Sequence, residues 1–100
     1  AQAALTSLGL WEQVAPRLAR ADNVRNALAL VERGEAPLGI TYATDALASG
    51  KVQVLALFPL ASHAPIRYPM ALLKGAGPTA QRFHAHLQTP AAQALLRQAG

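Results

Sequence analysis

The stretch DNVRNALALVERGEAPLGITYATD, residues 22–45, decides how this chain folds. Its first half carries apolar residues at the i, i+3, i+4 and i+7 spacing of one helical face. These residues are Val24, Ala27, Leu28 and Val31. Asp22 or Asn23 precedes them and can cap a helix start, and Gly34 follows where a left-handed glycine commonly ends a helix. The first half therefore predicts a helix that begins near Val24 and ends before Gly34.

The second half of the stretch changes from helix to strand. Residues 38–42 (LGITY) are a short, mostly apolar run without charge, which is typical of a strand covered on both faces. Thr44 or Asp45 can cap the next helix, which runs to Ser49 and is closed by a glycine. Residues 52–58 (VQVLALF) are a second apolar run. Strand, helix and strand in this order predict a βαβ unit with parallel strands.

The flanking segments complete an α/β pattern. Residues 1–9 and 10–19 predict two helices, the second kinked at Pro16. Residues 66–73 predict a third strand, at an edge of the sheet because Pro69 cannot donate to a ladder. Two further helices begin with a proline at their first position, Pro78 and Pro90. We expect their buried side chains to be Phe83, Leu87, Leu95 and Leu96.

Two donors of hydrogen bonds point to one candidate site. The helix that starts at Val24 exposes unpaired backbone N–H groups and the positive end of its dipole. Tyr42 carries a hydroxyl at the carboxyl end of the predicted strand, and ligands of open α/β sheets bind at such strand ends and helix starts. From the residues alone, an anion site and a simple capped helix with an aromatic residue at the edge of the core both remain open.

Composition excludes several other functions. The net charge is +4, but the arginines are scattered and form no basic run with interleaved aromatic residues, so the sequence does not predict nucleic-acid binding. The chain has no cysteine and hence no thiol chemistry. It has no apolar run long enough to cross a membrane and no signal peptide. If the protein is exported, we expect its signal upstream of residue 1.

No catalytic or metal-binding group is predicted. His84 and His86 are two residues apart on a helix, so they point in different directions and cannot share a metal ion. His63 follows Ser62, but no nucleophile elbow and no third partner accompany the pair. An enzyme would need a clustered nucleophile or acid–base pair, which the pattern does not supply.

The residues of the central stretch also resemble a known family. The run ALVERGEAPLGI-x-YATD, together with FPLASH and YPMALL further along, is similar to periplasmic molybdate-binding proteins, the substrate-capturing subunits of ABC molybdate importers. The resemblance covers nearly the whole chain. It implies a two-lobe type II periplasmic-binding-protein fold, a three-layer αβα arrangement with a mostly parallel sheet. Residues 1–58 then belong to part of the second, ligand-binding lobe, residues 59–65 to a hinge or crossover, and residues 66–100 to a return strand and helices. The first lobe lies outside this sequence.

The same resemblance implies a ligand and a site. The ligand is the oxyanion molybdate or tungstate, whose oxygens are contacted by the backbone N–H of Val24 and the hydroxyl of Tyr42, with no metal ligand, cofactor or catalytic residue. Asn23 and Arg25 are expected to lie next to these two donors and to hold them in place without contacting the anion themselves. The protein would work in the periplasm with a membrane permease as partner, and without nucleic acid.

Two alternatives to this interpretation remain. One is the effector-binding module of an anion-responsive transcription regulator, and the other is a binder of another tetrahedral oxyanion such as sulfate. We also expect the isolated 100 residues to associate with one another, because the apolar strands lack neighbours.

Overall fold

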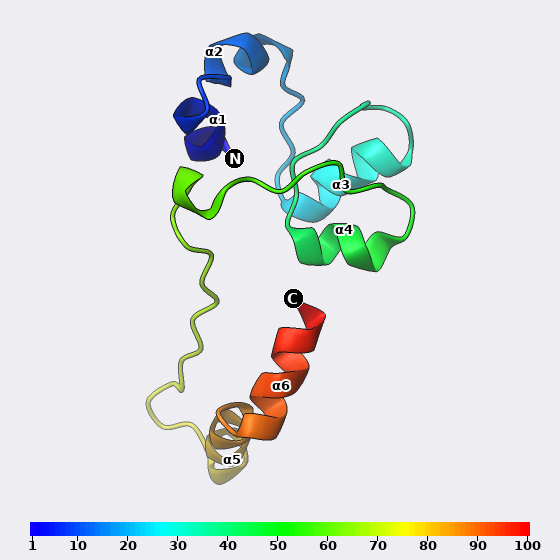
Figure 1. Cartoon of the computed structure of the whole chain (residues 1–100). Coiled ribbons are helices and arrows are strands. Elements are labelled where there is room, and N and C mark those ends of the chain that lie inside the picture. Colours follow the sequence, from blue (N-terminus) through cyan, green and yellow to red (C-terminus); the bar gives the residue numbers. More distant parts are fainter. The chain divides into compact units, whose positions relative to one another are not determined.

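The computed structural model describes all residues, 1–100, and consists of helices joined by irregular segments (Figure 1). The chain divides into a first unit, Ala1–Pro65, and a second unit, Ile66–Gly100. The first unit contains α1 (Gln2–Ser7), α2 (Trp11–Val14), η1 (Ala15–Arg17), α3 (Val24–Glu32), α4 (Ala43–Ser49) and η2 (Leu60–Ser62). The second contains α5 (Pro78–Leu87) and α6 (Pro90–Ala99). None of these helices is both long and apolar enough to span a membrane.

The predicted helices form where local signals place them. Helix α3 begins at Val24, and the side chain of Asn23 caps it by accepting a hydrogen bond from the Asn26 N–H at 2.9 Å. Gly34 follows with φ of 73°, the left-handed conformation that glycine adopts without strain. Pro78 and Pro90 are the first residues of α5 and α6. These boundaries agree with the sequence-based prediction.

The cap of α4 differs from the prediction. Its N-cap residue is Tyr42, and no side chain bonds the first turn. Thr44 and Asp45, the expected caps, lie inside the helix, where Asp45 places a negative charge in the first turn. A carboxylate at this position stabilises the helix through its dipole rather than by capping.

The predicted strands at residues 38–42, 52–58 and 66–73 are not formed, so the βαβ unit and the parallel sheet are not confirmed. All three segments have an irregular backbone and exchange no backbone hydrogen bonds with one another. The physical reason is that a strand is defined by its partner strand. An apolar run shows that a segment is suited to burial, but it does not supply the neighbour that pairs with it.

Each unit has only a small core of its own. In the first unit, α1 packs against α2 and η2, burying Ala4 and Leu5. Ser62 of η2 is also buried, and its hydroxyl donates to the Pro59 carbonyl at 2.6 Å. In the second unit α5 packs on α6 and buries Ala92. The packing of both units therefore relies on a few buried side chains, most of them small.

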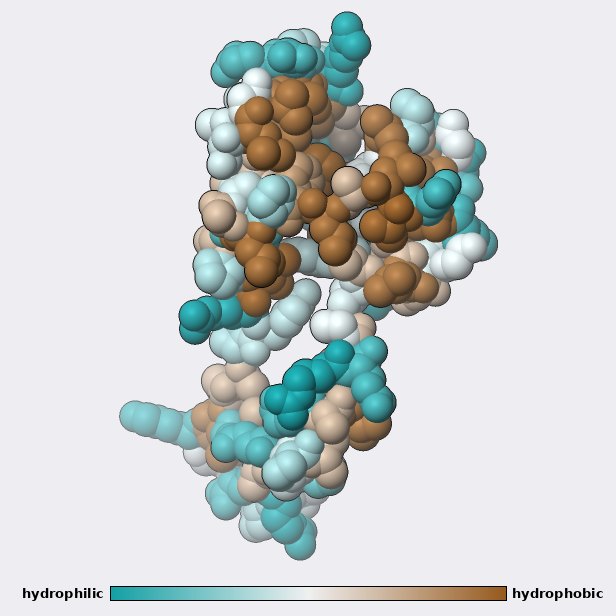
Figure 2. Space-filling model, viewed as in Figure 1, coloured by the Kyte–Doolittle hydropathy of each residue, from teal (hydrophilic) through white to brown (hydrophobic).

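Most large apolar side chains remain exposed, including three that we expected to be buried. Phe83, Leu95 and Leu96 are all more than half exposed, because a pair of helices covers only one face of each. Figure 2 shows hydrophobic residues gathered on the viewed face of the first unit. The chain exposes 8343 Å², whereas two separately folded units of these sizes would expose about 6,500 Å² together. Each unit by itself thus leaves much apolar surface exposed.

Candidate functional site

The candidate site lies at the starts of α3 and α4, which point the same way. At the far ends of these helices the hydroxyl of Ser49 donates a hydrogen bond to the Glu32 carboxylate. Helices α3 and α4 also contact each other directly. Since their last residues are joined and the helices are of similar length, their first residues lie on the same side of the unit, as Figure 1 shows.

Val24 is the first residue of α3, and its backbone N–H is an open donor. The two later N–H groups of the first turn are used: Asn26 donates to the Asn23 side chain, and Ala27 donates to the Asn23 carbonyl at 3.1 Å. The N–H groups of Val24 and Arg25 donate no hydrogen bond to another group of the protein. They lie at the positive end of the α3 dipole, where an anion is favoured.

Tyr42 stands at the start of α4, on the same side as Val24. Its carbonyl accepts a hydrogen bond from the Ala46 N–H at 3.2 Å and one from the Thr41 hydroxyl at 3.3 Å. These bonds fix the backbone of Tyr42, while the residue remains 40% exposed. A ligand in solution can therefore reach this side chain. The structure thus brings the helix starts that carry the two predicted site residues to one side of the unit.

The two residues predicted to support the site have different surroundings. Asn23 has an extended backbone, φ −152° and ψ 168°, and holds the first turn of α3 through its side chain and its carbonyl. It therefore fixes the direction of the N–H groups that follow. The Arg25 side chain is exposed and makes no ion pair. It contributes a positive charge near the helix start.

A feature that the sequence analysis did not anticipate connects α3 to Tyr42. Gly39 lies so close to α3 that an added Cβ would be 2.7 Å from Val31 Cγ2 and 3.9 Å from the Ala27 carbonyl oxygen. The segment before Tyr42 is thus packed directly on the apolar face of α3. A glycine in the middle of an apolar run is the signal that could have indicated this close approach.

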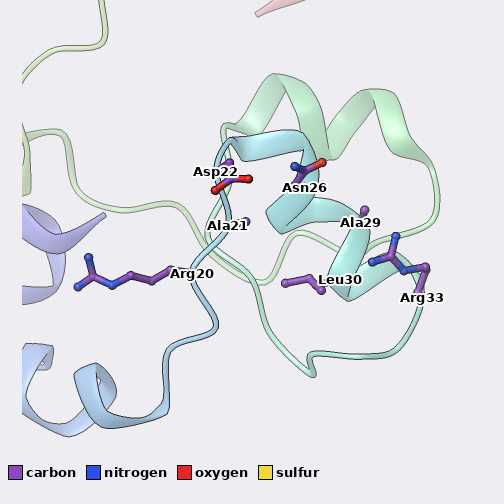
Figure 3. Close-up of a pocket in the computed structure, with 7 residues that line it drawn as sticks. All are labelled: Arg20, Ala21, Asp22, Asn26, Ala29, Leu30 and Arg33. Atoms are coloured by element: carbon purple, nitrogen blue, oxygen red, sulfur yellow. The ribbon is translucent and has the colours of Figure 1, made fainter.

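A hollow lies beside another part of α3, away from the candidate site. It has a volume of about 220 Å³ and contains neither Val24 nor Tyr42 (Figure 3). Its lining residues are Arg20, Ala21, Asp22, Asn26, Ala29, Leu30 and Arg33. Of the two guanidinium groups, that of Arg33 is already paired with Glu35, Nε to Oε1 at 2.6 Å. We therefore do not assign ligand binding to this shallow, mixed-charge hollow.

The Arg33–Glu35 pair bridges the turn that ends α3. Their hydrogen bond, with the attraction between the charges, raises the pKa of Arg33 and lowers the pKa of the Glu35 carboxyl. Both side chains are more than half exposed, so water screens the pair and it contributes little to stability. No group of three or more histidine, aspartate or glutamate side chains comes together in a way that could hold a metal ion.

Comparison with known proteins shows the family to which the chain belongs. The family model of the bacterial extracellular solute-binding proteins matches residues 1–100. The chain therefore belongs to this family of bacterial extracellular solute-binding proteins.

Individual relatives narrow the comparison. The molybdate-binding protein ModA of Haemophilus influenzae is 50% identical over 97 residues, 96% of this chain. That of Escherichia coli is 46% identical over 101 residues, the whole of this chain. A Bacillus subtilis protein described as a substrate-binding lipoprotein of an ABC transporter is 34% identical over 98 residues, again 96% of the chain. All three are named as binding proteins rather than enzymes. The chain spans 38–39% of the length of these relatives.

Proposed function

We propose that this chain contributes to a protein that binds molybdate outside the cytoplasm and delivers it to an ABC importer. The observation that carries the proposal is the placement of two helix starts on one side of the first unit, with the Val24 N–H at one and Tyr42 at the other. The similarity to two molybdate-binding proteins over nearly the whole chain supports it. Because the chain spans 38–39% of their length, we propose that it acts within a longer chain, called the whole protein below.

The chemistry of the anion fits a site built from donors. Molybdate at neutral pH carries two negative charges and no proton, so each of its oxygens only accepts hydrogen bonds. A site for this anion therefore needs hydrogen bond donors only. Backbone N–H groups at a helix start and a tyrosine hydroxyl can supply them. No countercharge in the site is required, because the dipole of α3 already favours an anion there. Tungstate has the same charge and shape, and we propose that it binds at the same site.

Selectivity follows from protonation and size. Hydrogen phosphate carries a proton that would find no acceptor among these donors, and such an unpaired group is costly when it is buried. Sulfate has no proton at neutral pH, so it must be rejected because it is smaller and cannot reach all the donors at once. We therefore propose that donors from the first lobe of the whole protein complete the site and set its size.

The proposal extends to the fold and the location of the whole protein. The exposed leucines of residues 38–42 and 52–58 suit a sheet, so we propose that these segments pair as strands of a mostly parallel sheet in a two-lobe fold. We also propose that the whole protein acts in the periplasm, with a membrane permease as its partner. The match to a family of extracellular solute-binding proteins supports this location. The named relatives do not favour the alternative of a regulator's effector module.

Titration calorimetry of the whole protein with sodium molybdate, tungstate, sulfate and phosphate tests the proposal. We expect molybdate and tungstate to bind with similar affinity, and sulfate and phosphate to bind at least about tenfold more weakly, a difference of about 1.4 kcal/mol. Sulfate binding more tightly than molybdate would favour the alternative of a sulfate-binding protein. A whole protein that binds none of the four anions would contradict the proposal.

A further inference from the structure

The segment before Tyr42 comes close to α3 where Gly39 lies against Val31. A Cβ at Gly39 would lie 2.7 Å from Val31 Cγ2, well inside the distance at which two carbon atoms attract each other. Gly39 has no positive φ. Backbone conformation therefore does not require a glycine at this position. The absence of a side chain is what lets the segment lie against the helix.

The geometry relates this contact to both donors of the proposed site. Val31 and Val24 lie on the same apolar face of α3, seven residues or about 10.5 Å apart along the axis. Tyr42 lies three residues after Gly39, which spans about 10 Å of extended chain. The segment leads to the start of α4. The last residues of α3 and α4 are joined by Glu32 and Ser49, and the two helices run the same way (Figure 1), so the segment runs back toward the start of α3. The two lengths match, so Gly39 at Val31 brings Tyr42 to the level of Val24.

We propose that Gly39 is a positioning residue for the oxyanion site, an inference that rests on the proposed function. Its close contact with Val31 sets the separation between the segment that carries Tyr42 and the helix that carries the Val24 N–H. A methyl group at position 39 would push the segment away from α3. The two donors would then no longer reach the same anion with good hydrogen bond geometry, although neither donor is removed.

A pair of substitutions tests this separation directly. In the whole protein, Gly39→Ala should weaken molybdate binding by about tenfold to a hundredfold, the equivalent of one hydrogen bond to a charged group. Val31→Ala removes Cγ2 and makes room for the new methyl group. We therefore expect the double variant Gly39→Ala with Val31→Ala to bind within about threefold of the native protein, which is less than half of the free energy of a tenfold change.

Gly77→Ala is the matched control. Gly77 precedes α5 in the second unit with φ of −70°, and no atom lies within 4 Å of an added Cβ. The same chemical change there should leave molybdate affinity unchanged. Thermal unfolding without ligand, measured for every variant, separates a loss of stability from a loss of affinity.

Coupling to Tyr42 distinguishes positioning from a general structural role. If Gly39 acts through Tyr42, then Tyr42→Phe should weaken binding strongly in the native protein and only slightly in the Gly39→Ala variant. An equal effect in both backgrounds, or native affinity of Gly39→Ala, would overturn the inference. If Gly39→Ala does not fold, the double variant decides: native-like binding supports the inference, and a folded double variant that does not bind overturns it. Failure of the proposed function would show separately, as no effect of Tyr42→Phe in the native protein.

Discussion

Ser49, the last residue of α4, donates a hydrogen bond to the carboxylate of Glu32, the last residue of α3. This bond joins two helices whose sequences are separated by a ten-residue connection, residues 33–42. The two helices run in the same direction, so that both of their positive ends face one side (Figure 1). The arrangement explains how residues 18 positions apart in the sequence, Val24 and Tyr42, come to share a candidate site.

Removing this bond should loosen α4. We expect Ser49→Ala to lower the free energy of unfolding of the whole protein by about 1 kcal/mol, because the bond is partly exposed and water recovers part of its energy. Chemical denaturation measures the change. Ser7→Ala is the matched control, since Ser7 also ends a short helix but its exposed side chain makes no hydrogen bond. Equal effects of the two substitutions would show that the Ser49–Glu32 bond does not stabilise the unit.

The backbone N–H of Val24 can be removed without breaking α3. Proline is favoured at the first position of a helix, as Pro78 and Pro90 illustrate here, and Asn23 already has the extended backbone that a following proline requires. We expect Val24→Pro to weaken molybdate binding by about 1.5–3 kcal/mol, and Val24→Ala to change it little. Calorimetry on both variants provides the comparison. If the alanine variant lost as much affinity as the proline variant, the side chain rather than the N–H would be responsible.

Asn23 offers a test of the electrostatics at the same helix start. Asn23→Asp keeps an N-cap residue of equal quality but adds a negative charge beside the anion. We expect native stability together with weaker molybdate binding, and the loss of affinity should shrink as salt is added. Asn23→Ala should instead lower stability by about 1 kcal/mol through loss of the cap. An aspartate variant that binds molybdate as well as the native protein would argue against an anion at this position.

The 100 residues alone should associate and bind molybdate weakly. Leu55 and Leu57 are about 70% exposed in a segment whose backbone has no partner, and such segments pair with other chains. The donors proposed for the first lobe are also absent from these residues, and each hydrogen bond to a charged group contributes about 1.5–3 kcal/mol. Light scattering and calorimetry on the chain test both points. A monodisperse monomer that binds molybdate tightly would contradict this expectation.

The signals that set helix boundaries in this chain are local. The cap at Asn23, the glycine after α3 and the prolines that begin α5 and α6 act within a few residues of where they stand, and the helix boundaries they indicate are found. Strand pairing and side-chain burial depend on distant partners. An apolar run predicts a strand, and the pattern around Phe83 predicts burial, but neither pattern shows whether a partner is present to pair with or to cover these residues.

The candidate site required both kinds of information. The helix start at Val24 follows from local sequence, but the placement of Tyr42 on the same side depends on the contacts of Gly39 with Val31 and of Ser49 with Glu32. Neither contact follows from periodicity. The similarity to molybdate-binding proteins, rather than residue patterns alone, favours an anion site over a simple capped helix.

The hydroxyl of Tyr42 is the most direct point at which to test the account. Tyr42→Phe removes one oxygen and keeps the ring. The matched control is Tyr68→Phe, the same change at the only other tyrosine of the chain, which lies in the second unit. Calorimetric titration of the whole protein with molybdate should show Tyr42→Phe binding more weakly by about 1.5–3 kcal/mol, and Tyr68→Phe binding like the native protein. Native affinity of the Tyr42→Phe variant would contradict the central claim that this hydroxyl binds the oxyanion.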